Sequence, residues 1–317
     1  MPRRNSRLQL EGLSQKPKPV CLVTGGGGFI GSALLPILCA SGWDVIATSQ
    51  TPRRKRNGVG WKTWRAEDGG VPDCDWNKLD CVIHLANPRV QSRDISELQR
   101  QVESGVLATS RLLEKAVRHK VRRFVFVSTG DVVSPPGGIA QETDNDYSAT
   151  SFYSAAKASS ELLTRSCAAL LSTAIVRVYH PFGPGGDDFL INRMIAAVAA
   201  GREITLERDG GILINPIWID DLARGLALAA KADATGVFHL AGPDTLRFAD
   251  FLRLTGRMLG KPVTLHTSAA SPSLNHAGDC RRARRLLGWR PAMRLRAGLR
   301  KMMPPLEQTS AAFIGPT

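Results

Sequence analysis

The chain has 317 residues, of which 43% are hydrophobic and 22% are charged, a composition typical of a globular protein with a sizeable core. No apolar run reaches the length of a membrane-spanning helix, and residues 1–19 are basic and polar, without the apolar stretch of a secretory signal. We therefore expect a cytoplasmic protein that does not associate with membranes.

The formal net charge is +14, which favours anionic partners. The basic runs are scattered and do not form one stripe with interleaved aromatic residues, so no nucleic-acid partner is expected. The six cysteines form no CxxC pair, and none lies at zinc-ligand spacing from a histidine. This pattern predicts reduced thiols and no metal site.

In the first half of the chain, short apolar runs alternate with segments of helical periodicity. Strands are expected at 20–23, 44–48, 81–86, 124–127 and 174–178, and helices at 30–40, 95–119 and 153–171. Alternation of this kind predicts an α/β fold with a Rossmann-like, doubly wound parallel sheet covered on both faces.

After about Pro181 the alternation loosens, and a smaller C-terminal α/β lobe is expected. Its predicted helices lie at 189–200, 221–231 and 248–259, and its predicted strands begin near 217 and 237. The expected division is a flexible basic arm at 1–18, a dinucleotide-binding domain with the catalytic residues at 19–180, a substrate-binding lobe at 181–305 with elements returning to the sheet around 212–242, and a tail at 306–317.

A glycine-rich turn follows the first predicted strand and opens the first predicted helix, in the run TGGGGFIG at 24–31. Gly25, Gly28 and Gly31 have the spacing that permits a tight turn, backbone approach to a pyrophosphate and close packing of the helix. The turn therefore predicts an NAD or NADP site that includes Gly25, Gly28, Phe29 and Ile30.

In a dinucleotide-binding fold, residues at the end of the second strand contact the adenosine ribose. An acid there would hydrogen-bond the ribose hydroxyls and favour NAD. The run Thr48 to Arg54 contains no acid and ends in Arg53 and Arg54. Together with the hydroxyl of Ser49, these arginines predict a 2′-phosphate site and a preference for NADP over NAD. The alternative is a solvated basic loop.

Tyr153 and Lys157 are four residues apart on a predicted helix, so they share one face. A lysine ammonium beside a phenol stabilises the phenolate, which suits the phenol to proton transfer while a nicotinamide moves a hydride. Thr129 ends the apolar strand before this helix, at the sheet edge where ligands bind in open α/β sheets.

These motifs together resemble an extended short-chain dehydrogenase/reductase of the NAD(P)-dependent epimerase/dehydratase type, over roughly residues 18–303. The supporting segments are TGGGGFIG at 24–31, DCVIHLAN at 80–87, RRFVFVST at 122–129, YSAAK at 153–157, INPIWIDDLARG at 214–225, FHLAGPD at 238–244 and LLGWRP at 286–291. The resemblance implies that Thr129 binds the reacting oxygen, Tyr153 is the acid/base, and Lys157 holds the nicotinamide ribose and tunes Tyr153. It places Leu85 and Ala86 beside the adenosine.

The resemblance also implies a homodimer formed by the helices at 95–119 and 153–171. Two positions depart from the family pattern. Gly130 stands where sugar dehydratases carry the first acid of an Asp-Glu pair, so dehydration is not expected, and Asp131 is either a second acid/base or a turn residue. His180 replaces the asparagine of the R-P-x-N-x-Y-G-P segment and is either a substrate contact and proton donor or a buried structural histidine.

The substrate side is the least defined part of the sequence. The arginine that binds the diphosphate of nucleotide sugars in the family is replaced by Ile214; Arg193 or Arg247 is a candidate substitute. Asp131 and His180 are expected to contact the substrate, together with three side chains of the C-terminal part: Phe189, Asn192 and Trp218.

The preferred hypothesis is an NADP- or NAD-dependent oxidoreductase that reduces a ketone, or oxidises the alcohol, on a sugar-like and nucleotide-linked small molecule. The first alternative is a nucleotide-sugar epimerase with tightly held cofactor. A second is a ketone reductase for a secondary-metabolite or steroid-like substrate, which the missing arginine favours. A catalytically idle, cofactor-sensing or RNA-binding protein, motivated by the net charge, is disfavoured by the intact Thr129, Tyr153 and Lys157.

Overall fold

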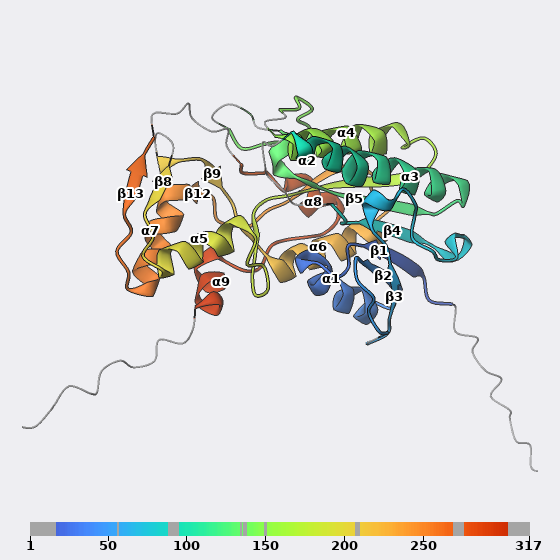
Figure 1. Cartoon of the computed structure of the whole chain (residues 1–317), viewed down its shortest axis with the longest axis horizontal. Helices are drawn as coiled ribbons and strands as arrows, with labels where there is room; N and C mark the ends of the chain where they lie inside the picture. The colour runs from blue at the N-terminus through green and yellow to red at the C-terminus, as the bar shows by residue number, and fades with distance from the viewer. Residues whose placement is uncertain are drawn as a thin grey trace, which may run out of the picture.

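The computed structural model describes residues 17–55, 57–87, 95–133, 135, 138–148, 151–206, 210–268 and 276–303. Except for residues 17 and 18, the predicted N-terminal arm lies outside these ranges, as does the predicted tail at 306–317. At the centre is a seven-stranded sheet of order β11-β6-β5-β4-β1-β2-β3, with every pairing parallel (Figure 1). The strands are β1 (Val20–Thr24), β2 (Asp44–Ser49), β3 (Val59–Thr63), β4 (Cys81–His84), β5 (Arg123–Thr129), β6 (Ser172–Val178) and β11 (Gly236–Leu240).

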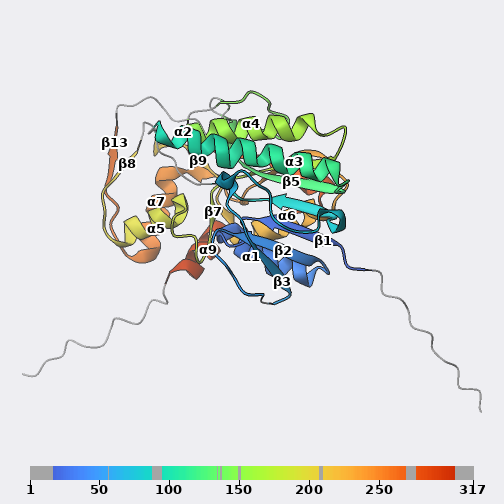
Figure 2. The ribbon, with the colours of Figure 1, turned by 45° about the vertical axis from the view of Figure 1, so that its right-hand side comes forward.

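Helices cover both faces of the sheet (Figure 2). On one face α1 (Phe29–Ala40) packs against α6 (Ile219–Lys231). The other face carries α4 (Phe152–Ser166) beside a continuous helix made of α2 (Ser96–Gln101), the π turn η3 (Val102–Leu107) and α3 (Ala108–Arg118). Single turns of 3-10 helix lie in two connections: η1 (Ala66–Asp68) and η2 (Trp76–Lys78) between β3 and β4, and η4 (Gly130–Val132) between β5 and α4.

Alternation along β1 explains why both faces need cover. Cys21 and Val23 lie in the apolar cluster that includes Leu34 of α1, whereas Leu22 lies in the cluster that includes Leu112 of α3. Because neighbouring side chains of a strand point to opposite faces, a strand buried on both sides reads as a continuous apolar run. The second core is therefore as essential to the sheet as the first.

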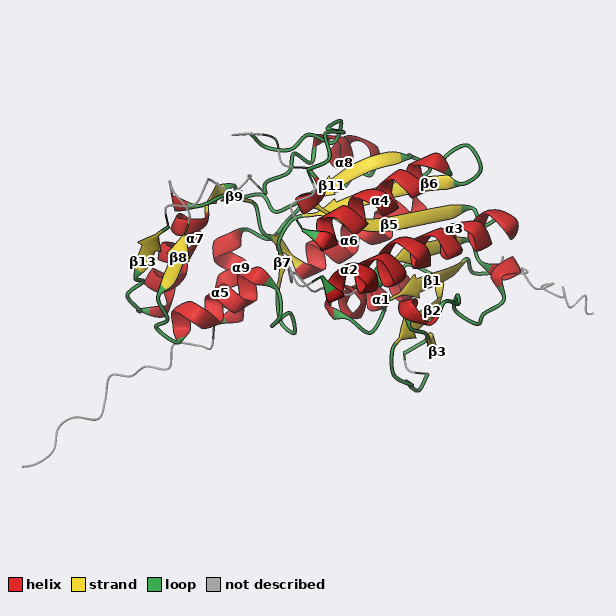
Figure 3. Ribbon diagram, turned by 45° about the horizontal axis from the view of Figure 1, so that its top comes forward, coloured by secondary structure: helices red, strands yellow, loops and turns green. Residues whose placement is uncertain are grey.

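A second group of elements lies apart from the sheet, on the left of Figure 1 and of Figure 3. It contains α5 (Leu190–Ala199), α7 (Phe248–Leu259), α9 (Leu295–Met302) and the strand pairs β8 (Ile204–Leu206) with β13 (Leu265–Thr267) and β9 (Leu213–Ile214) with β12 (Leu246–Arg247). Two links return to the sheet side: β7 (Pro181–Phe182) pairs with β10 (Ile217–Trp218), and α8 (Arg281–Leu286) packs on β11. The predicted division of the chain near residue 181 stays a proposal.

The predicted fold class is confirmed, and the differences concern boundaries and short elements. The helix predicted to continue to Leu171 ends at Ser166, and Leu170 in the following turn is 70% exposed. The strand β3 was not predicted, because it lies at the sheet edge and only Val59 of its five residues is buried. In the described part of the chain, no helix combines the length and apolar composition that crossing a bilayer requires.

Candidate active site

Two adjoining cavities open at the carboxyl ends of the sheet strands. One, of about 490 Å³, lies over the β1–α1 turn and the end of β2. The other, of about 340 Å³, lies over the ends of β5 and β6 and the start of α4. Five residues line both cavities: Ile30, Leu85, Asn87, Asp188 and Phe189. A molecule that fills the first cavity can therefore meet one that fills the second, at the edge where open α/β sheets bind ligands.

The glycine turn has the geometry of a pyrophosphate cradle. Gly25 has a φ of +69°, and a Cβ there would lie 2.8 Å from the backbone nitrogen of Ala86. A Cβ on Gly31 would lie 2.6 Å from the Cα of Gly26, so α1 packs directly on the turn. Among the described residues, no side chain caps α1 and its first turn carries no acid. Its first N–H groups therefore suit an anionic ligand.

Most of the predicted cofactor residues lie around this cavity, whereas Tyr153 and Lys157, also predicted to contact the cofactor, line the second cavity. Those that line the first cavity are Gly25, Gly28, Phe29, Ile30, Ser49, Arg53, Leu85 and Ala86. Arg53 donates from Nη2 to the carbonyl of Gly27 at 3.3 Å, and its guanidinium lies 5.0 Å from the ring centroid of Trp61. Arg54 is exposed and is not part of the cavity lining. The two adjacent arginines are thus not equivalent.

The three predicted catalytic residues line the second cavity. Thr129 ends β5, and its hydroxyl oxygen accepts a hydrogen bond from the backbone of Asp131 at 3.2 Å. Tyr153 and Lys157 lie on α4, whose N-terminus is capped by reciprocal hydrogen bonds between Ser151 and Ser154. The cap fixes the start of the helix two residues before Tyr153.

Lys157 is held in an unusual environment. Its side chain is 4% exposed, and its Nζ donates to the carbonyl of Val127 at 2.8 Å. Burial lowers the pKa of Lys157 to about 7, and the negative charge of Glu161 offsets part of that effect. Glu161 is itself paired with Arg177 at 2.8 Å, with both side chains fully buried. Burial therefore favours the neutral form of this lysine more strongly than water does.

The ring of Tyr179 fills the space beside Gly130. A Cβ on Gly130 would lie 2.8 Å from Cζ of this ring and closer still to Cε1. On the opposite edge, a Cβ on Gly278 would lie 2.8 Å from Cδ2 and closer to Cε2. The ring is 1% exposed and its hydroxyl lies 3.3 Å from Nδ1 of His239. An acid at position 130 therefore has no room for its side chain.

Two histidines and a carboxylate form one wall of the second cavity. Nδ1 of His276 lies 3.2 Å from Oδ1 of Asp131, and the rings of His276 and His180 are stacked, 5.8 Å apart and inclined by 16°. His180 has a φ of +43°, and its buried Nε2 has no hydrogen-bond partner among the described residues. His276 was not predicted, because nothing in its local sequence distinguishes it.

The remaining predicted substrate residues differ in their placement. Phe189 lines both cavities and packs on Phe29 with ring centroids 4.5 Å apart. Asn192 is buried away from the cavity linings, where its amide binds both the N–H and the carbonyl of Gly183. Trp218 is also buried outside the linings and donates to Asp220 at 2.9 Å. The structure therefore does not bring these last two to the cavities.

The two candidate arginines for a diphosphate are also separated. Arg193 of α5 is exposed and lines the second cavity. Arg247 donates to the carbonyl of Gly211 at 3.2 Å and is not part of that lining. Arg193 is thus the candidate that lies at the cavity.

Comparison with known proteins gives the same family throughout. The model of the NAD dependent epimerase/dehydratase family matches residues 21–241. The dTDP-glucose 4,6-dehydratase of Streptomyces griseus is 29% identical over 298 residues, which cover 88% of this chain and 91% of that protein. UDP-glucuronic acid decarboxylase 1 of Xenopus tropicalis is 24% identical over 308 residues, which cover 91% of this chain and 72% of that protein.

Solved structures agree with the sequence relatives. MoeE5 in complex with UDP-glucuronic acid and NAD is 26% identical, has a TM-score of 0.76, and is matched over 89% of this chain and 96% of that chain. The family model covers more than half of the chain and includes β1, the glycine turn, Thr129, Tyr153 and Lys157. The chain is therefore an enzyme of the NAD dependent epimerase/dehydratase family, as its motifs indicate.

Proposed function

We propose that the enzyme moves a hydride between a nicotinamide cofactor and a carbon of a sugar-like, nucleotide-linked substrate, reducing a ketone or oxidising the corresponding alcohol. The observation that carries this proposal is the shared wall of the two cavities. The glycine turn lines one cavity and the Thr129, Tyr153 and Lys157 set lines the other, with five residues common to both. A cofactor in the first cavity would reach a substrate in the second.

The cofactor would supply the hydride, and the side chains would manage the proton. Tyr153 would give a proton to the carbonyl oxygen during reduction, or take one from the hydroxyl during oxidation. Lys157 in its charged form would stabilise the phenolate, and it lies one helical turn from Tyr153. Thr129 would donate a hydrogen bond to the same substrate oxygen, because its own oxygen already accepts from the backbone of Asp131.

For the cofactor we propose NADP in preference to NAD. No acid ends β2, and Arg53 lines the cavity beside Ser49, which suits a 2′-phosphate. The matched family is described as NAD dependent and MoeE5 was solved with NAD, so the preference rests on these side chains alone. Net ketone reduction is the corresponding direction, since it consumes the reduced cofactor.

A nucleotide-linked substrate is supported by Arg193 at the cavity, because an arginine can donate hydrogen bonds to a diphosphate. Dehydration is not proposed, because Tyr179 occupies the space of the missing acid at position 130. The expected homodimer, cytoplasmic location and lack of nucleic-acid binding are carried forward as proposals.

Epimerisation is the second candidate. UDP-glucuronate 4-epimerase of Thermodesulfobacterium geofontis is 27% identical over 233 residues, which cover 70% of this chain and 71% of that protein. An epimerase returns its hydride to the sugar, so its cofactor shows no net change. Purified protein with bound NAD that survives dialysis, and no net change in reduced-nicotinamide absorbance during turnover, would favour the epimerase over the reductase.

The test uses purified enzyme with NADP or NAD, each reduced and oxidised, and UDP-glucuronic acid, UDP-glucose and dTDP-glucose as probes. Conversion is followed by NMR and by nicotinamide absorbance. Tyr153→Phe is expected to lower turnover by about 10²–10⁴-fold while the cofactor still binds. Ser159→Ala is the control on the same helix, since Ser159 is exposed and is not part of either cavity lining. Unchanged turnover in Tyr153→Phe would refute the proposed role.

A further inference from the structure

The wall formed by Asp131, His180 and His276 has no role in the hydride transfer described above. Its three side chains come from distant parts of the chain, after β5, after β6 and before α8. They line the same cavity as Tyr153, with His276 3.2 Å from Asp131 and stacked on His180. A carboxylate paired with one nitrogen of an imidazole is the arrangement that orients a histidine for proton transfer.

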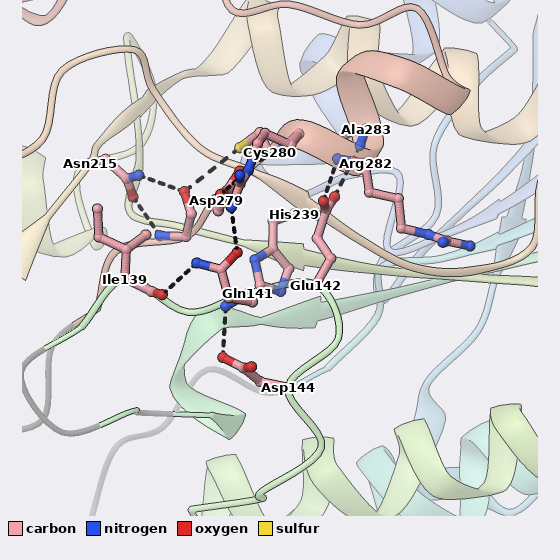
Figure 4. Close-up of polar contacts among 12 residues, drawn as sticks. Ile139, Gln141, Glu142, Asp144, Asn215, His239, Asp279, Cys280, Arg282 and Ala283 are labelled. Atoms are coloured by element: carbon pink, nitrogen blue, oxygen red, sulfur yellow. Dashed lines mark hydrogen bonds and ion pairs between the residues drawn. The ribbon is translucent and has the colours of Figure 1, made fainter.

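Hydrogen bonds hold the backbone at His276 and at Gly278. The N–H of His276 donates to the carbonyl of Leu213 at 2.9 Å. Gly278 lies two residues after His276. The side chain of Asn215 donates from Nδ2 to the carbonyl of Gly278 at 2.8 Å and accepts from the N–H of Gly278 at 3.1 Å (Figure 4). These contacts hold the backbone that carries the imidazole beside the cavity.

The half-buried carboxylate of Glu142 anchors the same segment further along. Glu142 accepts hydrogen bonds from the N–H groups of His239 at 2.9 Å, Ala283 at 3.0 Å and Arg282 at 2.5 Å (Figure 4). Residues 276–283 are thus tied to β11 and to the loop that follows β5. Such preorganisation is what a catalytic side chain outside the regular elements requires.

The Nε2 atom of His180 is buried within this wall. Burial, followed by the charge of His276, lowers the pKa of His180 to about 4. This Nε2 has no hydrogen-bond partner among the described residues, although buried polar atoms normally form hydrogen bonds. The left-handed backbone of His180 is a strained conformation for a histidine and is characteristic of functional positions.

We propose that His276 is a second catalytic acid/base, oriented by Asp131, that exchanges a proton with the substrate carbon next to the carbonyl carbon at Tyr153. This inference rests on the proposed function, because the hydride transfer generates, or the substrate brings, the ketone that makes the neighbouring C–H acidic. Asp131 engages Nδ1, which leaves Nε2 of His276 as the nitrogen that exchanges the proton.

The step balances within the site. The C–H bond next to the ketone breaks, its proton bonds to Nε2 of His276, and its electron pair forms the enolate. Tyr153 and Thr129 donate hydrogen bonds to the enolate oxygen, and Asp131 balances the imidazolium charge. The other charged groups on the lining are Lys157, Arg193 and Asp188, which together add positive charge. Return of a proton to the carbon regenerates neutral imidazole and ketone.

Solvent exchange tests this step. The full chain is incubated in D2O with cofactor and UDP-glucuronic acid, UDP-glucose or dTDP-glucose, and deuterium at each sugar carbon is read by NMR and mass spectrometry. Single-turnover nicotinamide absorbance measures hydride transfer in parallel. We expect deuterium at the carbon next to the oxidised one. His276→Gln should lower that incorporation by about 100-fold or more, and hydride transfer by less than about tenfold.

Two comparisons separate chemistry from folding. His266→Gln is the matched control, because His266 also pairs with a carboxylate, Glu203 at 3.0 Å, but is exposed and not part of either cavity lining. Asp131→Asn should lower exchange about tenfold relative to hydride transfer, and Asp131→Glu should restore part of the loss.

Each outcome decides the inference. Selective loss of exchange in His276→Gln and Asp131→Asn supports it. Exchange that persists in His276→Gln overturns it, as does hydride transfer by the wild type without any deuterium at carbon. Absence of hydride transfer with every probe and cofactor would overturn the proposed function and the inference together. If His276→Gln does not fold, an equal fall of both rates in Asp131→Asn overturns the proposal.

Discussion

A single methyl group added at Gly130 tests the claim that Tyr179 excludes an acid from this position. The new Cβ of Gly130→Ala would lie 2.8 Å from Cζ of the ring, with Cε1 closer still. Overpacking a close-packed core costs about 1–3 kcal/mol. The ring cannot move away, because the backbone of Gly278 closes its opposite edge. We therefore expect the upper end of that range, about 3 kcal/mol of unfolding free energy.

Equilibrium unfolding in urea measures this cost. Gly70→Ala is the matched control, since a Cβ on Gly70 meets no atom within 4 Å and its φ is not left-handed. In a Tyr179→Leu background the Gly130→Ala penalty should shrink by about 2 kcal/mol, because the clashing edge of the ring is gone. Equal unfolding free energies for Gly130→Ala and Gly70→Ala would refute the reasoning.

Three further predictions follow from buried or cavity-lining charges. The native pKa of Lys157, about 7, lies below its unfolded value of 10.5. Between those pH values the unfolded chain binds more protons, so the free energy of unfolding rises with pH. From pH 7 to 9, urea unfolding of the wild type should show a gain of about 2 kcal/mol relative to Lys157→Met. Arg53→Ala should weaken NADPH binding by about tenfold or more and leave NADH within about twofold, as read by nicotinamide fluorescence. Glu161→Gln should cost about 3–5 kcal/mol, because it leaves the buried guanidinium of Arg177 unpaired.

Each of these three has a control variant or an outcome that would contradict it. Arg54→Ala, in the same loop but outside the cavity lining, should leave both cofactor affinities unchanged; an equal effect of the two arginines would contradict the 2′-phosphate site. Glu114→Gln breaks an exposed pair with Arg118 and should cost less than about 1 kcal/mol. If the unfolding free energies of wild type and Lys157→Met change in parallel with pH, the lysine is charged in the folded protein and the prediction is wrong.

The cofactor site was predictable because its signal is local. Gly25 and Gly31 stand at fixed spacing between a strand and a helix, and each is required by a contact within the same turn or with the adjacent strand end at Ala86. Tyr153 and Lys157 share one helix face, so their spacing alone brings them together. Sequence spacing does not indicate burial, however, so the low pKa of Lys157 could not be predicted without the structure.

The substrate side was less predictable because tertiary packing decides it. Trp218 and Asn192 look like substrate ligands in sequence, yet one packs its ring edge-on against Phe182 and the other closes a turn at Gly183. Conversely, His276 reaches the cavity only because β9 and Asn215 hold its segment there. Periodicity cannot describe contacts between segments that are remote in the chain.

The glycine at position 130 and the placement of His276 have one physical origin. Tyr179 needs a glycine on either edge of its ring, and this requirement accounts for Gly130 and for the backbone approach of Gly278. The close approach of Gly278 brings the segment of His276 to the cavity, where Asp131 meets it. Asp131, the carboxylate that remains after Thr129, therefore pairs with the imidazole of His276 instead of with the substrate. Restoring an acid by Gly130→Asp would then disrupt the ring and the histidine together, and it should not produce a dehydratase.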